Sequence, residues 1–136
     1  MALNIAGIDH IVLRTTRLGE MLAFYCGVLG CIVERALPPK TGLVQLRAGD
    51  ALIDLVIVDS ELGREGGGPP TATENNMDHF CLLLEPITED EIREHLKKHE
   101  IAFGDFSERY GSEGFGQSVY IRDPEGNTIE LRSIKK

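Results

Sequence analysis

The sequence predicts an α+β fold made of two βαβββ modules, and three observations support this prediction. The order of strand-like and helix-like segments is the same in both halves of the chain. A glycine- and proline-rich stretch, Gly66-Gly67-Gly68-Pro69-Pro70, separates the halves. Each half also opens with an Asp-His pair at the start of an apolar run. We therefore expect a single domain over residues 1–136, with modules at 6–60 and 76–135 whose mixed sheets curve around a shared cleft.

The first module begins with a predicted strand over Ile8–Arg14 and a predicted helix over Leu18–Leu29. Apolar residues recur through the helix at the spacing of one helical face, and Gly30 fits the left-handed position that commonly follows a helix. Three strand-like runs complete the module: Ile32–Leu37, Gly42–Arg47 and Ala51–Val58. The polar stretch from Asp59 to Asn76 is predicted to be a connection without regular structure.

The second module repeats this order. Met77–Leu84 is a predicted strand, and Thr88–His99 is a predicted helix in which Thr88 and Glu91 have the spacing of a capping box. Between the last two strands, the stretch Asp123-Pro124-Glu125-Gly126-Asn127 has the composition of a turn. The strands expected after the helix are Phe103–Ser107, Gln117–Arg122 and Thr128–Ile134.

Composition and charge limit the classes of partner. The chain has 14 basic and 22 acidic residues and a net charge of −8 with histidine neutral, which disfavours nucleic acid or an anionic membrane as the partner. No apolar run approaches the ~20 residues of a membrane-spanning helix, and the N-terminus does not resemble a secretory signal, so we expect a cytoplasmic protein. Three cysteines without CxxC spacing are predicted to be free thiols: Cys26, Cys31 and Cys81.

The two modules carry matching polar residues at matching positions. Asp9-His10 and Asp78-His79 each open an apolar strand, and a single carboxylate interrupts the last strand of each module, Asp54 in the first and Glu130 in the second. Burying an ionised carboxylate without a partner is costly, and a cation would remove that cost. Two imidazoles and two carboxylates suit a first-row divalent ion such as Zn, Ni, Mn, Fe or Co. We therefore predict one divalent metal ion with His10, His79, Glu130 and Asp54 as its ligands.

Asp54 leaves alternatives open. Its side chain is one methylene shorter than that of Glu, so it could reach the ion through water or pair with a nearby arginine instead. The remaining two histidines, His95 and His99, lie at i,i+4 spacing on the second predicted helix and could also bind a metal, although a solvated helix face explains them more simply.

Four motifs carry a resemblance to a known family. They are Asp9-His10-Ile11-Val12-Leu13, the stretch from Phe24 to Gly30, Asp78-His79-Phe80, and the stretch from Asp123 to Leu131. With these motifs the chain resembles the vicinal oxygen chelate superfamily, which includes glyoxalase I, extradiol dioxygenases, and fosfomycin and bleomycin resistance proteins. The resemblance covers about Ile8 to Ile134.

The resemblance implies paired βαβββ modules, usually in a homodimer, with a divalent metal in the cleft. The family's metal ligands fall on His10, His79 and Glu130. Its first-half carboxylate is commonly Glu, and Asp54 stands in that place, so a three-ligand site completed by water remains open. In the glyoxalase case a metal-bound carboxylate also shuttles the proton, and this role falls on Glu130.

Residues near the predicted ligands distinguish the branches of the family. Arg14 lies where bacterial glyoxalases have a glutathione-contacting arginine, whereas Val58 stands where those enzymes tend to have asparagine. Ser118 and Tyr120 precede the Asp-Pro-Glu-Gly-Asn turn as they do in fosfomycin thiol transferases. An extradiol dioxygenase usually has a longer chain and a His–Tyr acid/base pair that is not evident here. Cys81, two residues after His79 on one strand face, completes the predicted substrate-binding set of Arg14, Cys81, Ser118 and Tyr120.

The sequence therefore predicts a metal-dependent glyoxalase-like enzyme that acts on a small vicinal-oxygen substrate. The leading activity is a lactoylglutathione-lyase-type isomerisation of a glutathione conjugate, in a homodimer. One alternative is a non-catalytic small-molecule binding protein, like the bleomycin-sequestering members, which need no metal; another is a fosfomycin-type thiol transferase. The glycine-rich stretch Arg109–Gly116 is expected to be a loop that covers the substrate.

Overall fold

The computed structural model describes residues 3–6, 8–69, 71 and 77–135 of the chain. The chain divides into two compact units, with the boundary after Thr71. Asn76, the first residue of the predicted second module, lies outside the described residues, as does part of the predicted connection. No helix among the described residues is long and apolar enough to cross a membrane.

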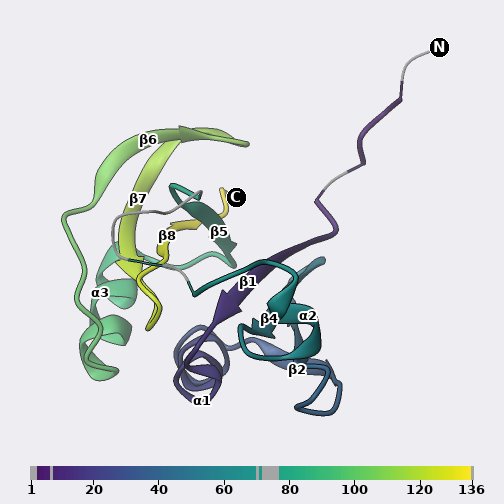
Figure 1. The fold of residues 1–136 in the computed structure, drawn as a ribbon. Coiled ribbons are helices and arrows are strands. Elements are labelled where there is room, and N and C mark those ends of the chain that lie inside the picture. The colour runs from purple at the N-terminus through teal and green to yellow at the C-terminus, as the bar shows by residue number, and fades with distance from the viewer. Residues whose placement is uncertain (1–2, 7, 70, 72–76, 136) are drawn as a thin grey trace. The chain divides into compact units, whose positions relative to one another are not determined.

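The first unit has the predicted order of a strand, a helical segment and three strands (Figure 1). Its sheet has the strand order β1-β4-β3-β2, with β1 parallel to β4 and the other neighbours antiparallel. The elements of this unit are β1 (His10–Thr15), α1 (Leu18–Leu22), η1 (Ala23–Val28), β2 (Ile32–Ala36), β3 (Leu43–Ala48), β4 (Ala51–Ile57) and α2 (Glu61–Arg64).

The second unit repeats this topology (Figure 1). Its sheet has the order β5-β8-β7-β6, again with the first strand parallel to the last and the other pairs antiparallel. Its elements are β5 (Phe80–Leu84), α3 (Glu89–Lys98), β6 (Ser107–Gly111), β7 (Gly114–Arg122) and β8 (Thr128–Ser133). The prediction of an α+β fold with two βαβββ modules is confirmed.

The helical segments differ in part from the prediction. The expected single helix over Leu18–Leu29 is an α-helix that continues as a π-helix over Ala23–Val28, where the N–H of Leu29 donates to the carbonyl of Phe24, five residues earlier. The short helix α2 lies within the stretch that was expected to have no regular structure. Ser60 explains its start, because the Ser60 hydroxyl accepts a hydrogen bond from the N–H of Gly63 at 3.0 Å.

Helix α3 has the predicted capping box. The Thr88 hydroxyl accepts from the N–H of Glu91, and the Glu91 carboxylate accepts from the N–H of Thr88. Ile92 and Leu96, one turn apart, are its buried residues. The cap fixes where the helix begins, and the apolar pair fixes which face is buried.

The expected loop over Arg109–Gly116 is instead the β6–β7 hairpin. Tyr110 pairs with Phe115 and Gly111 with Gly114 across its turn. Gly114 has φ +88°, a conformation that an L-residue adopts only with strain. The prediction of a loop was therefore wrong for this stretch, while its substrate-covering role stays a prediction. The predicted strand over Phe103–Ser107 is displaced to Ser107–Gly111.

The core of each unit follows the alternation of its strands. In the first unit, buried side chains from the sheet and from the helical segments form the core; they include Leu13, Leu46, Ile53, Leu55, Met21, Phe24 and Tyr25. In the second unit the buried set is Ile92, Leu96, Val119, Ile121, Ile129 and Leu131. The opposite face of each sheet carries polar residues, and both candidate carboxylates lie there, at Asp54 and Glu130.

Candidate metal centre

In the first unit, β1 and β4 bring His10 and Asp54 to the same face of the sheet. Val12 pairs with Asp54 in the parallel register, and His10 lies two residues before Val12, so both side chains are on that face. The His10 ring accepts or donates at Nδ1 to the Asp9 carboxylate at 2.7 Å. This hydrogen bond raises the pKa of His10, and the negative charge of Asp54 adds to the shift.

Asp54 is almost fully buried, with 4% of its surface exposed. Its Oδ2 accepts a hydrogen bond from Gln45 at 3.2 Å, and its Oδ1 is buried without a hydrogen-bond partner among the described residues. No ion pair between Asp54 and an arginine is found within that part of the chain. An unpartnered carboxylate oxygen in a buried place is costly, and a bound cation would offset that cost.

In the second unit, His79 and Glu130 are in direct contact. Nε2 of His79 lies 3.2 Å from Oε1 of Glu130, and Nδ1 of His79 lies 2.6 Å from the Asp78 carboxylate. Glu130 is buried, with 6% of its surface exposed. Two donor atoms that each lie ~2.1 Å from one ion are about 3.0–3.4 Å apart at octahedral or tetrahedral angles. The separation of these two atoms is therefore suited to a shared metal ion.

The donor set fits a divalent ion in chemistry as well. Imidazole nitrogen and carboxylate oxygen suit first-row divalent metals, and each imidazole has a carboxylate on its other nitrogen, as metal-bound histidines commonly do. Each unit supplies two of the four predicted ligands: His10 and Asp54, or His79 and Glu130. No group of three or more His, Cys, Asp or Glu side chains that could hold an ion is found among the described residues.

Three of the predicted substrate-binding residues lie on the same sheet face as Glu130. Cys81 and Tyr120 are the two cross-strand neighbours of Glu130, and the Tyr120 ring meets the His79 ring edge to face, 5.2 Å between centroids. Burial and the charge of Glu130 raise the pKa of Cys81 to about 11, so its thiol is protonated near neutral pH. Ser118, one row along, is fully buried.

Two arginines of the second unit were not predicted as site residues. Arg109 donates to the backbone oxygen of Ser118 at 2.7 Å and to its hydroxyl at 3.0 Å, and its guanidinium lies 4.3 Å from the centre of the Tyr120 ring. Arg132 is buried and donates to the carbonyl of Gly114 at 3.0 Å. A Cβ at Gly116 would lie 2.5 Å from the Arg132 guanidinium, so the glycine makes room for this side chain.

Arg14 is bound to α2 and to the loop that follows it. Its guanidinium donates to the carbonyl oxygens of Gly63 and Gly68, both at 3.1 Å, and to that of Gly67. Its Nε is buried without a partner among the described residues. The expected contact between Arg14 and a substrate anion stays a prediction, and the contacts in the structure hold the loop.

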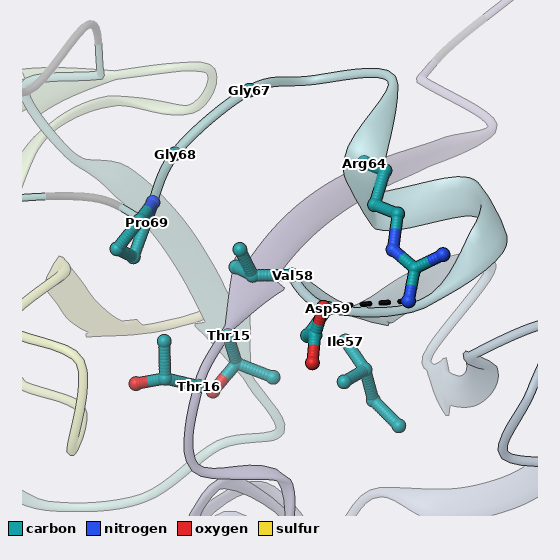
Figure 2. A pocket seen from close by; sticks show the side chains of 9 residues that line it. All are labelled: Thr15, Thr16, Ile57, Val58, Asp59, Arg64, Gly67, Gly68 and Pro69. Carbon is teal, nitrogen blue, oxygen red and sulfur yellow. Dashed lines mark ion pairs between the residues drawn. The ribbon is translucent and has the colours of Figure 1, made fainter.

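A pocket of about 600 Å³ lies beside this loop in the first unit. Figure 2 shows Val58, Ile57 and the two threonines on one side and the Gly67–Pro69 segment on the other, with the Arg64–Asp59 ion pair at 3.5 Å. The lining residues are Thr15, Thr16, Ile57, Val58, Asp59, Arg64, Gly67, Gly68 and Pro69. The Arg14 contacts to Gly67 and Gly68 therefore fix one wall of the pocket.

Sequence reasoning also missed residues that contact the predicted ligands. Asp9 and Asp78 each bind the Nδ1 of the histidine that follows, and the signal was present as the repeated Asp-His pair. Gln45 binds Asp54, but a single glutamine in a strand carries no such signal.

Comparison with known proteins identifies the family. The family model described as "Glyoxalase/Bleomycin resistance protein/Dioxygenase superfamily" matches residues 7–131. The chain is 31% identical over 124 residues to Virulence protein STM3117 of Salmonella typhimurium, covering 91% of this chain and 81% of the relative. It is 25% identical to the Glyoxalase domain-containing protein RDO1 of Mycosarcoma maydis, covering 98% of this chain and 71% of the relative.

Solved structures agree with this assignment. The crystal structure of STM3117 has a TM-score of 0.72 with 27% identity and covers 98% of this chain and 100% of that chain. A lactoylglutathione lyase from Agrobacterium tumefaciens has a TM-score of 0.70 with 26% identity and covers 96% of this chain and 95% of that chain. By its matched residues and its two-module fold, the chain belongs to the Glyoxalase/Bleomycin resistance protein/Dioxygenase superfamily.

Proposed function

We propose that the chain is a metal-dependent glyoxalase-like enzyme, in which His10, Asp54, His79 and Glu130 bind one divalent ion. The observation that carries this proposal is the 3.2 Å contact between His79 Nε2 and Glu130 Oε1. The unpartnered, buried Oδ1 of Asp54 supports it from the first unit. When bound, the ion supplies a Lewis acid that stabilises negative charge on two neighbouring substrate oxygens.

Lactoylglutathione-lyase-type isomerisation is the activity we propose. The substrate is the hemithioacetal of methylglyoxal and glutathione. The reaction moves one proton from the carbon that carries sulfur to the neighbouring carbon, and the hydroxyl proton from the oxygen of the first carbon to the oxygen of the second. Glu130 accepts the proton from the carbon that carries sulfur and delivers it to the neighbouring carbonyl carbon, so the net change is an isomerisation to a thioester. Tyr120 and Cys81, the neighbours of Glu130 in the sheet, line the face on which this transfer takes place. The similarity to a lactoylglutathione lyase supports this choice.

Metal analysis tests the ligand set. Purified protein is expected to hold close to one divalent ion per chain, and His10→Ala or His79→Ala is expected to lose most of it. His95→Ala is the matched control, because it also replaces a histidine by alanine, but on helix α3 and outside the proposed ligand set. Full metal content in both site variants would contradict the proposed ligands.

Kinetics with the hemithioacetal test the reaction. Glu130→Gln keeps the size of the side chain and removes its capacity to accept a proton, so kcat is expected to fall by ~10²-fold or more. Metal content and the melting temperature are measured alongside. A wild-type protein that binds metal and has no activity on this substrate, with Zn, Ni, Mn, Fe or Co, would exclude this activity. A protein that binds small ligands without any metal would instead support the non-catalytic binding function.

A further inference from the structure

A series of three polar side chains crosses the sheet of the first unit toward the predicted metal ligand Asp54. Arg35 on β2 pairs with Gln45 on β3, and Gln45 pairs with Asp54 on β4, so the three occupy one row of one sheet face. Arg35 Nε donates to Gln45 Oε1 at 2.7 Å, and Gln45 Nε2 donates to Asp54 Oδ2 at 3.2 Å. The hydrogen bonds therefore run in one direction, from the edge strand to Asp54.

The two neighbours of Gln45 fix the orientation of its amide. A guanidinium has only donors, so the atom of Gln45 that faces Arg35 must be the oxygen. An ionised carboxylate has only acceptors, so the atom that faces Asp54 must be the nitrogen. Rotating the amide by 180° would break both hydrogen bonds at once. Arg35 thus keeps the N–H of Gln45 directed at Asp54.

The contact with Gln45 also distinguishes the two oxygens of Asp54. Oδ2 is occupied by the Gln45 amide, whereas Oδ1 is buried and has no hydrogen-bond partner among the described residues. Asp54 has one rotatable bond fewer than Glu130. If its carboxylate rotates, Oδ1 moves away from an ion, and the shorter side chain cannot bring it back by adjusting another bond. Because Gln45 holds Oδ2 in place, Oδ1 is the oxygen that remains available to bind an ion.

We propose that Gln45 is a positioning residue for Asp54, and that Arg35 acts through Gln45, so that Oδ1 of Asp54 is presented to the divalent ion. This inference rests on the proposed function, because it assigns a role toward the ion that His10, Asp54, His79 and Glu130 bind. It adds two residues outside the ligand set, and residues that orient metal ligands typically contribute ~10–100-fold to metal affinity.

Titration of the full-length, metal-stripped protein with Co²⁺ tests the inference. Gln45→Met keeps the length of the side chain and removes the donor, and it is expected to weaken Co²⁺ binding by ~10–100-fold. Arg35→Met is expected to weaken binding in the same direction and to add nothing in the Gln45→Met background, because Arg35 acts through Gln45. Arg35 is exposed, so its variant tests the inference even if Gln45→Met does not fold.

Arg47→Met is the matched control. Arg47 lies on β3, two residues from Gln45, and forms an ion pair with Glu34 at 3.2 Å rather than a contact with Gln45. Replacing Arg47 by Met removes one positive charge, as Arg35→Met does. Its Co²⁺ affinity is expected to stay within about twofold of wild type, since exposed ion pairs contribute little. Thermal unfolding of each variant separates loss of metal affinity from loss of fold.

The outcomes distinguish the two proposals. A wild-type protein that binds no divalent ion removes the proposed function and the positioning role together. A wild-type protein that binds Co²⁺, with Gln45→Met and Arg35→Met binding equally tightly, overturns the positioning role alone. Equal effects of Arg35→Met and Arg47→Met, or an undiminished effect of Arg35→Met in the Gln45→Met background, overturn the claim that Arg35 acts through Gln45.

Discussion

Gly63→Ala is predicted to destabilise the first unit. Gly63 lies in α2, and a Cβ built there would be 2.5 Å from the carbonyl oxygen of Val58 and 2.6 Å from its carbonyl carbon, and closer still to the carbonyl oxygen of Ile57. These are backbone atoms at the end of β4, which cannot rotate away as a side chain could. The added methyl group must therefore push α2 off the end of the strand.

The size of the effect follows from the contacts that depend on α2. The Ser60 cap on the Gly63 N–H is worth ~0.5–2 kcal/mol. The charge-assisted bond from Arg14 to the Gly63 carbonyl is worth ~1.5–3 kcal/mol, and its part-buried setting favours the lower end. Together they give a loss of about 2–4 kcal/mol in the free energy of unfolding. At ~4 °C per kcal/mol for a chain of this size, the melting temperature falls by roughly 8–16 °C.

Thermal unfolding followed by circular dichroism, with a urea titration at 25 °C, measures this loss. Gly19→Ala is the control, because Gly19 also lies in a helix and has nothing within 4 Å of its built Cβ. That substitution is expected to stabilise by ~0.5–1 kcal/mol, since alanine has the higher helix propensity. A Gly63→Ala melting temperature within ~2 °C of wild type would refute the steric argument.

Three further predictions concern single groups. The hydrogen bond from Asp9 raises the pKa of His10 above 6.5; desolvation opposes this shift and the charge of Asp54 adds to it. An NMR titration of the metal-free protein is therefore expected to give a His10 midpoint above 6.5, and Asp9→Asn is expected to lower that midpoint. Because the pKa of His10 is higher in the folded than in the unfolded protein, protonated His10 stabilises the fold below the unfolded-state pKa, and this stabilisation is lost as pH rises through the folded-state pKa. A His10 midpoint that is the same in Asp9→Asn and wild type would contradict the role of the Asp9 hydrogen bond. With a pKa of about 11, Cys81 is expected to react with iodoacetamide at pH 8 on the order of 100-fold more slowly than a small thiol. Equal rates would argue against the partial desolvation and the Glu130 charge as causes of this raised pKa, since the residue is otherwise exposed. Thr88→Ala removes the α3 capping box and is expected to lower the free energy of unfolding by ~0.5–2 kcal/mol in urea titration, whereas no change would show that the cap is dispensable.

The fold could be predicted from the sequence because its signals are local and occur twice. Apolar alternation located most strands, and the Thr88–Glu91 spacing located the start of α3. The π-helical turn at Ala23–Val28 could not be predicted, because apolar spacing does not tell a hydrogen bond to the fourth residue from one to the fifth. The β6–β7 hairpin was missed because its glycines indicate a loop, whereas Gly116 accommodates Arg132 from the neighbouring strand β8.

The candidate ligands were predicted from the repeated pattern of residue types, but their neighbours depend on strand pairing. Gln45 lies opposite Asp54 only because β3 and β4 pair in one register, and a shift by one residue would place Leu46 or Val44 there. The same holds for Tyr120 beside Glu130. The contact between His79 and Glu130 likewise requires that β5 and β8 be parallel neighbours, which sequence spacing alone does not state.

The pairing of the first strand of each unit with its last strand has a consequence for how the chain folds. In the first unit β1 can pair only after β4 has been synthesised, and in the second unit β5 can pair only after β8 has been synthesised. Each sheet is therefore complete only after nearly all of its unit has been synthesised. Such non-local pairing carries a loop-closure cost that slows folding. All partners of β1 nevertheless precede Thr71, so on the ribosome the first sheet can close while the second unit is still being synthesised. A pulse-labelling experiment on stalled nascent chains that end near residue 110 should find the amide hydrogens of β1 and β4 already protected from exchange.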